Sequence, residues 1–211
     1  MIFKDQMPQP TEGLKMAMHL RYEDEMPRIA SGTLTIEMKD ARTGEVLHYS
    51  EHHNKITYDA SILVAILTKD PASRAHGIFM LAVGTGATGA LLAPNAPDAR
   101  QRKLNAEIAR KAFSSTTFRD ALGNAVAIPT NIVDFTASFG EAEAVGPLTE
   151  MGLISPISSN PLVTNSNPNA FPVRDVTVDV STLDLLINYL TFPCIFKPST
   201  AVLSLTWRLT Y

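Results

Sequence analysis

The end of the chain constrains the fold more than any other segment. From Leu203 to Tyr211, apolar and polar side chains alternate without a break. Every second position is apolar or aromatic, namely Leu203, Leu205, Trp207, Leu209 and Tyr211. Because the side chains of a β-strand point alternately to opposite faces, this pattern predicts a strand with one face in the core. We expect a terminal strand this regular to lie inside a sheet.

Earlier segments continue the β pattern. Apolar residues fall on every second position of Gly32–Lys39, Asp40–Gly44 has the composition of a turn, and Glu45–Ser50 can return as the partner strand. Further strands are expected at Gly77–Val83, 131–139, 148–155, Arg174–Val180 and Leu186–Phe196. The segment Leu104–Phe118 is open between helix and strand. The sequence therefore predicts an all-β fold, an antiparallel β-sandwich of jelly-roll or immunoglobulin-like type.

One short helix is expected within this sandwich, roughly from Tyr58 to Thr68. Thr57 or Asp59 could cap it, and Ile62, Leu63, Ile66 and Leu67 would cover one face. Residues 31–211 are predicted to form a single domain. Residues 1–30 carry five of the eight methionines and are read as an extended arm, either a frayed terminus or a segment that orders on a neighbouring subunit.

Composition narrows the possible partners. Hydrophobic residues make up 45% of the chain and charged residues 18%, with a net charge of −3. No stretch forms the dense basic stripe that phosphate neutralisation needs, so nucleic acid is not an expected partner. The longest apolar run, around Ile62–Leu67, is too short to span a bilayer, so no membrane association is expected either.

The segment Gly84-Thr85-Gly86-Ala87-Thr88-Gly89 has the spacing of a dinucleotide-binding loop. Such a loop must open a helix, but Pro94 and Pro97 prevent a helix of useful length here. We therefore interpret the glycines as a tight turn at the end of a strand. No cofactor is expected.

Catalytic and metal-ligating residues are not predicted at any position. His48 and His52 would share one sheet face about 13 Å apart, as four strand rises imply, which is too far for a common metal. Cys194 lies in an apolar run and is expected to be a buried thiol. Glu141 and Glu143 are read as part of a solvated turn. The basic residues are concentrated at Arg100, Arg102, Lys103, Arg110 and Lys111, which could bind phosphate or lipid or form a charged contact with another subunit.

Four segments taken together resemble small virion structural proteins of tailed bacteriophages. They are the hairpin from Asp40 to Val46 with Asn54–Thr57 and the helix after it, Leu81–Gly86 with Leu104–Arg110, Leu148–Leu153, and Tyr189–Phe192 with the final strand. Their order spans residues 32–211.

This resemblance implies a β-rich, non-enzymatic subunit of the neck or collar, the baseplate or a fibre adaptor. It implies copies of the chain itself, in a ring or trimer, and other virion proteins as partners. The chain would be assembled in the host bacterial cytoplasm and located in the virion. The alternatives are a capsid decoration protein and a carbohydrate-binding β-sandwich module.

Overall fold

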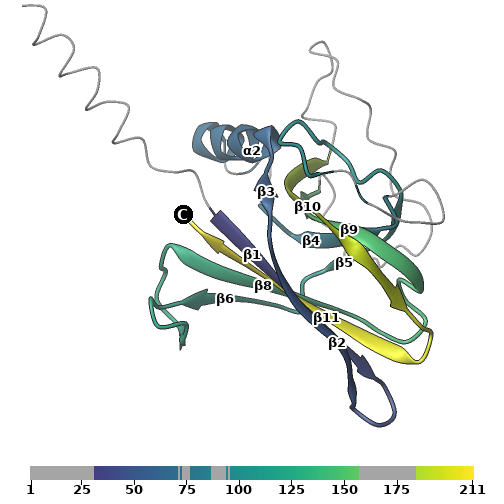
Figure 1. Ribbon diagram of the computed structural model, residues 1–211. Coiled ribbons are helices and arrows are strands. Elements are labelled where there is room, and N and C mark those ends of the chain that lie inside the picture. The colour runs from purple at the N-terminus through teal and green to yellow at the C-terminus, as the bar shows by residue number, and fades with distance from the viewer. Residues whose placement is uncertain (1–30, 71, 73–76, 87–93, 95, 157–183) are drawn as a thin grey trace, which may run out of the picture.

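The computed structural model of the protein describes residues 31–70, 72, 77–86, 94, 96–156 and 184–211 (Figure 1). The predicted N-terminal arm, residues 1–30, lies outside the described residues, as does the predicted strand Arg174–Val180. The described chain is mostly β-structure with a 12-residue α-helix. Its strands form two antiparallel sheets that face each other across a common core, which confirms the predicted β-sandwich.

The first sheet, sheet A, has six strands in the order β2-β1-β11-β8-β6-β7. Their bounds are β1 Ser31–Asp40, β2 Val46–His53, β6 Ser115–Arg119, β7 Ala125–Val126, β8 Ile132–Phe139 and β11 Ala201–Thr210. The alternating C-terminal segment is β11, and it lies between β1 and β8 (Figure 1). The prediction that the last strand sits inside a sheet is therefore confirmed.

The second sheet, sheet B, has five strands in the order β3-β10-β9-β4-β5. Their bounds are β3 Lys55–Ile56, β4 Met80–Gly84, β5 Glu107–Ala112, β9 Gly146–Ser155 and β10 Leu185–Lys197. The segment Leu104–Phe118, open between helix and strand in the sequence, supplies β5 to sheet B and β6 to sheet A. The chain passes between the two sheets at Phe113 and Ser114, the two residues that separate these strands.

The main core lies between the inner faces of the two sheets. Sheet A contributes Leu34, Ile36, Phe139 and the buried face of β11, and sheet B contributes Leu81, Met151, Leu153 and Leu185, among others. A second apolar cluster, which contains Met80, Leu104, Ile154 and Leu186, packs separately. Neighbouring residues of β9 thus belong to different clusters, so sheet B is covered on both faces. The outer face of sheet A is mainly hydroxyl-bearing and charged.

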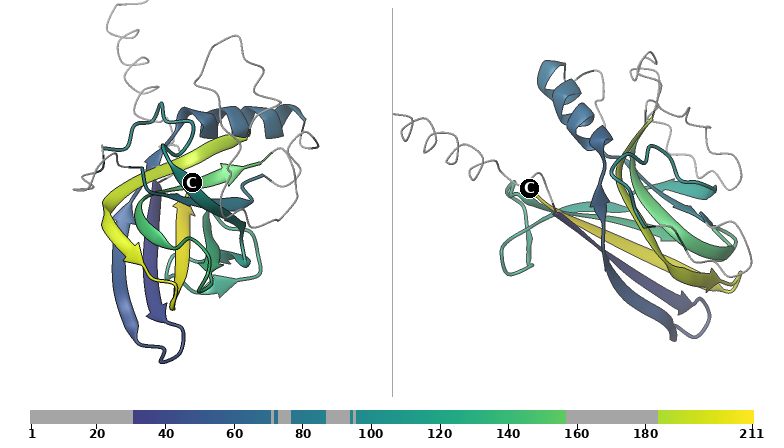
Figure 2. Two further views of the ribbon diagram at one scale, coloured as in Figure 1. Left: turned by 90° about the vertical axis from the view of Figure 1, so that its right-hand side faces the viewer. Right: turned by 45° about the horizontal axis from the view of Figure 1, so that its top comes forward.

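The helix α2, Tyr58–Lys69, agrees closely with the predicted helix and packs against β10. It lies at one end of the molecule, whereas the β1–β2 hairpin turn lies at the opposite end (Figure 2). Thr57 occupies the N-cap position but makes no side-chain cap bond. Its hydroxyl donates instead to the main-chain oxygens of Leu186 and Ile187. Thr57 therefore connects the start of α2 to β10 by hydrogen bonds and does not cap the helix with its side chain.

Two expectations for the C-terminal part of the chain are wrong. Cys194 is exposed, although its apolar neighbours suggested a buried thiol. The pairing of β10 with β9 shifts register between Thr191 and Ile195, so Pro193 and Cys194 are both turned outward. Tyr211 is 55% exposed because it lies one residue beyond the end of β11.

Candidate functional site

The two described glycines of the Gly84–Gly89 segment make room for a buried carboxylate. A Cβ atom on Gly84 would lie 2.7 Å from Glu150 Oε1 and 2.6 Å from the main-chain oxygen of Ala106. A Cβ atom on Gly86, whose φ is +43°, would lie 2.6 Å from Glu150 Cδ. These distances are shorter than van der Waals contact, so packing against Glu150 requires glycine at both positions. Gly89 lies outside the described residues.

Glu150 is fully buried in β9 and accepts four hydrogen bonds. The main-chain N–H groups of Asn105 and Ala106 donate at 3.0 and 2.8 Å, Asn105 Nδ2 donates at 3.2 Å, and the Tyr189 hydroxyl donates at 2.7 Å. Burial, followed by the charge of Glu150, raises the pKa of Tyr189. The carboxylate joins β9 and β10 to the segment before β5. Glu150 was not predicted as a site residue from the sequence. A single acidic residue within an otherwise apolar strand could have indicated a buried polar site.

Three residues of the basic cluster pair with acids of the same chain. Arg102 lies 2.6 Å from Asp59 on α2, and both side chains are largely buried. Arg110 lies within 2.6 Å of Glu107 and Asp184. Lys111 Nζ lies 2.7 Å from Glu143 in the β8–β9 connection. These three cations are therefore paired within the chain. Among the contacts of the described residues, the side chains of Arg100, which is exposed, and Lys103, which is half-buried, have no acidic partner.

The predicted turn around Glu141 and Glu143 is held by lysines. Glu143 accepts a hydrogen bond of 2.7 Å from the Gly140 N–H in addition to its pair with Lys111. Lys197 is fully buried and donates to the main-chain oxygens of Gly140 and Glu141 at 2.7 and 3.3 Å. Burial lowers the pKa of Lys197. The acidic pair thus belongs to a turn, as expected, in which Glu141 is exposed and Glu143 is paired with Lys111.

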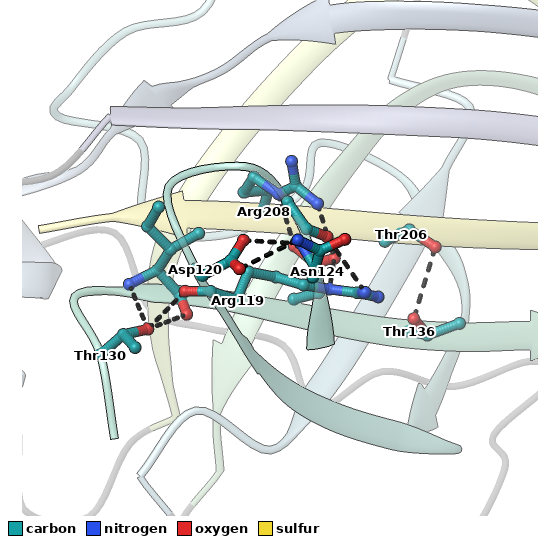
Figure 3. Close-up of polar contacts among 10 residues, drawn as sticks. Arg119, Asp120, Asn124, Thr130, Thr136, Thr206 and Arg208 are labelled. Carbon is teal, nitrogen blue, oxygen red and sulfur yellow. Dashed lines mark hydrogen bonds and ion pairs between the residues drawn. The ribbon is translucent and has the colours of Figure 1, made fainter. Parts of the chain in front are cut away.

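Asp134 joins three strands of sheet A. It is buried on β8 and accepts from Arg208 Nε on β11 at 2.7 Å and from Arg119 Nε on β6 at 2.8 Å. Figure 3 shows the two arginines. Burial alone would raise the pKa of Asp134, but the hydrogen bonds and charges of Arg208 and Arg119 lower it. Nearby, Asp120 and Asn124 close the turn between β6 and β7 (Figure 3). These contacts connect β8 to β6 and β11 and stabilise the turn after β6, so they hold one side of sheet A together.

Three histidines, His48, His52 and His53, lie on β2, an edge strand of sheet A. His48 and His52 share one face, as predicted, and both Nε2 atoms reach the Ser50 hydroxyl, at 2.8 and 3.0 Å. The His52 ring also lies against Phe192 of β10, with ring centroids 5.6 Å apart. His53 is exposed on the opposite face. In the described part of the chain, no three histidine, cysteine, aspartate or glutamate side chains gather where they could hold a metal.

Exposed apolar side chains gather near the same strand. Val46, Leu47 and Tyr49 of β2 are 51%, 44% and 57% exposed, and Phe196 near the end of β10 is 63% exposed. The turn after β10 contacts the β1–β2 hairpin through a hydrogen bond from the Ala41 N–H to the Thr200 oxygen, 2.8 Å long. The candidate functional site is therefore a surface, the edge strand β2 with the turns beside it.

No known family and no curated protein matches this chain. None of the helices described in the structure is long and apolar enough to cross a membrane. The functional assignment therefore depends on the geometry of the chain itself and on the resemblance carried by its segments.

His52 gives the fold a pH dependence. Burial, followed by the charge of His48, lowers the pKa of His52 from its ordinary value of 6.5. Because the unfolded chain then binds a proton more readily than the folded chain, the free energy of unfolding should fall as the pH drops from about 6.5 toward 5. Urea unfolding at several pH values measures this slope. His52→Gln should flatten it, whereas His53→Gln on the exposed face should not; equal slopes in all three proteins would contradict the assignment.

Proposed function

We propose that this chain is a non-enzymatic structural subunit of a tailed-phage virion, located in the tail region at the neck or collar, the baseplate or a fibre adaptor. It acts by binding copies of itself and neighbouring virion proteins. The observation that carries the proposal is the exposed edge strand β2, with Val46, Leu47 and Tyr49 turned to solvent. Apolar side chains at an open strand edge are a feature of surfaces that bind other chains.

The interior supports the same proposal. Its buried charged groups are bound within the chain, Glu150 by four donors, Asp134 by two arginines and Lys197 by two main-chain oxygens. Such groups fix the positions of strands and are not available to a substrate. A subunit of a large assembly needs this rigidity, because its contacts must keep one geometry in every copy.

The four segments that resemble tailed-phage virion proteins correspond to the central elements of the fold. The segment from Asp40 to Val46 forms the turn between β1 and β2, and Asn54–Thr57 leads to α2. The second pair covers parts of β4 and β5, Leu148–Leu153 lies in β9, and the last covers parts of β10 and β11. The segments that carry the resemblance therefore lie in the same sandwich.

The capsid decoration protein remains the structural alternative, and the carbohydrate-binding module is the alternative from another class. A sugar site commonly presents a flat exposed aromatic ring, and the single tryptophan of this chain, Trp207, is fully buried. This observation counts against the sugar-binding alternative.

Quantitative mass spectrometry of particles purified from the phage that encodes this chain tests the proposal. We expect the chain in intact particles, in several copies each, and in the tail fraction after heads and tails are separated. Recovery in the head fraction would support the decoration alternative. Absence from purified particles, with the chain present in the lysate, would overturn the proposal.

A further inference from the structure

In the described part of the chain, the outer edge of β2 is unpaired, and the one register shift in its pairing with β1 lies at the end of the strand, at Leu47. β2 pairs with β1 along seven register positions, and in the described part of the chain no strand pairs with its other side. Proteins commonly block such an edge with lysine, proline or a very short strand. β2 is eight residues long and contains neither lysine nor proline. At the opposite edge of the same sheet, β7 has two residues.

We propose that β2 pairs antiparallel with β2 of a second copy, around a two-fold axis that passes through Ser50. The two copies of sheet A then form one continuous sheet. This inference rests on the proposed function, because it names one of the contacts by which the subunit binds copies of itself. A two-fold contact uses the same surface on both chains, so it requires that β2 be complementary to itself.

The outer face of β2 meets this requirement. In an antiparallel pair, residues directly opposite each other point to the same face of the sheet. A two-fold axis at Ser50 therefore places Tyr49 opposite the partner's Glu51, and this pair occurs twice. Within one chain, the Tyr49 hydroxyl already donates to Glu51 at 2.7 Å. The hydrogen bond from Tyr49 to Glu51 can therefore form between the two chains in place of the bond within each chain. No additional charged group is buried at the contact.

Neighbouring registers fit less well. An axis at Glu51 would place that carboxylate opposite the partner's Glu51, which is a repulsive like-charge pair. An axis at Tyr49 would place the apolar side chain of Leu47 opposite the partner's Glu51, so this carboxylate would have no hydrogen-bond donor opposite it. With the axis at Ser50, the inner face brings His48 opposite the partner's His52. Both are half-buried beside Ser50, and β1 presents Leu34 and Met38 opposite them.

Charge variants of Tyr49 test both the contact and its register, with dimerisation measured by sedimentation velocity. Tyr49→Glu places two glutamates opposite each other at two symmetric positions and should weaken dimerisation about tenfold or more. Tyr49→Lys places a lysine opposite the partner's Glu51, where the attraction of opposite charges offsets the usual effect of lysine at a strand edge, so this variant should dimerise within about threefold of wild type. Tyr49→Glu combined with Glu51→Lys restores opposite charges and should recover the dimer.

Tyr58→Glu is the matched control, because Tyr58 is 54% exposed but lies on α2. It should leave dimerisation unchanged, and circular dichroism and tryptophan fluorescence should show that each variant is folded. Equal dimerisation of Tyr49→Glu and wild type, or a wild-type chain that stays monomeric at all concentrations, would overturn the β2 contact. If the chain forms an oligomer whose affinity is the same in all these variants, the β2 contact is wrong but the proposed function still stands. A chain that dimerises through β2 but is absent from purified particles would overturn the function alone.

Discussion

Trp207→Ala should produce unfolded or insoluble protein. Trp207 is fully buried in the middle of β11, opposite Leu34 on β1 and Phe135 on β8, which are also buried. Removing a buried tryptophan side chain typically costs about 3–5 kcal/mol, a large share of the roughly 5–15 kcal/mol by which a domain is stable. Expression in soluble form, followed by urea unfolding of any soluble fraction, measures the effect.

A polar contact adds to this cost. With the Asn188 amide oriented to suit its hydrogen-bond partners, the indole N–H donates to its oxygen at 3.3 Å, and Asn54 Nδ2 donates to the same oxygen. Trp207 on sheet A is thereby joined to Asn188 on sheet B. Removing the indole leaves the buried amide without this donor, which adds a penalty to the loss of packing.

Thr206→Ala is the control for the tryptophan substitution. Thr206 is the preceding residue and points to the outer face, where its hydroxyl lies 3.3 Å from that of Thr136 (Figure 3). It should fold with a loss of about 1 kcal/mol or less. Arg208→Ala should also fold, because Asp134 keeps its contact with Arg119. Soluble Trp207→Ala with wild-type stability would contradict the buried position of this side chain.

Glu150→Ala should destabilise the fold by roughly 3 kcal/mol or more. The substitution leaves two main-chain N–H groups, the Asn105 amide and the Tyr189 hydroxyl without their acceptor in a buried site. Each buried donor that loses its partner costs about 1–3 kcal/mol, and the methyl side chain leaves a cavity as well. Urea unfolding followed by circular dichroism gives the change in free energy.

Tyr189→Phe is the matched variant, because it removes one of the four donors and keeps the ring. It should cost about 1 kcal/mol, well below the effect of Glu150→Ala. Glu150→Gln should fall between the two, since it keeps the shape but turns an amide N–H₂ toward groups that donate. If Glu150→Ala were no more harmful than Tyr189→Phe, the carboxylate would not be the organising group of this site.

Much of the sandwich could be predicted because its strands have a simple period. β1 and β11 alternate strictly, and α2 follows a helical pattern that ends before Pro71. The segment Leu104–Phe118 could not be assigned, because its residues serve two sheets with different neighbours. Cys194 was misjudged because a register shift turns two consecutive residues outward, which hydrophobicity alone does not indicate.

The ion pairs and buried hydrogen bonds between distant segments could not be predicted, for another reason. Arg110 and Asp184 are separated by 74 residues, and Asn105 and Glu150 by 45. No local spacing relates such residues, since only the packing of the sheets brings them together. For this reason the basic cluster looked available to a partner, although Arg102, Arg110 and Lys111 are paired within the chain.

We propose that this chain functions by binding copies of itself. Size-exclusion chromatography with light scattering on the full-length chain tests it most directly, over a wide range of concentration. We predict a molar mass that rises with concentration to a whole-number multiple of 22.9 kDa. A mass of 22.9 kDa at every concentration would contradict the claim.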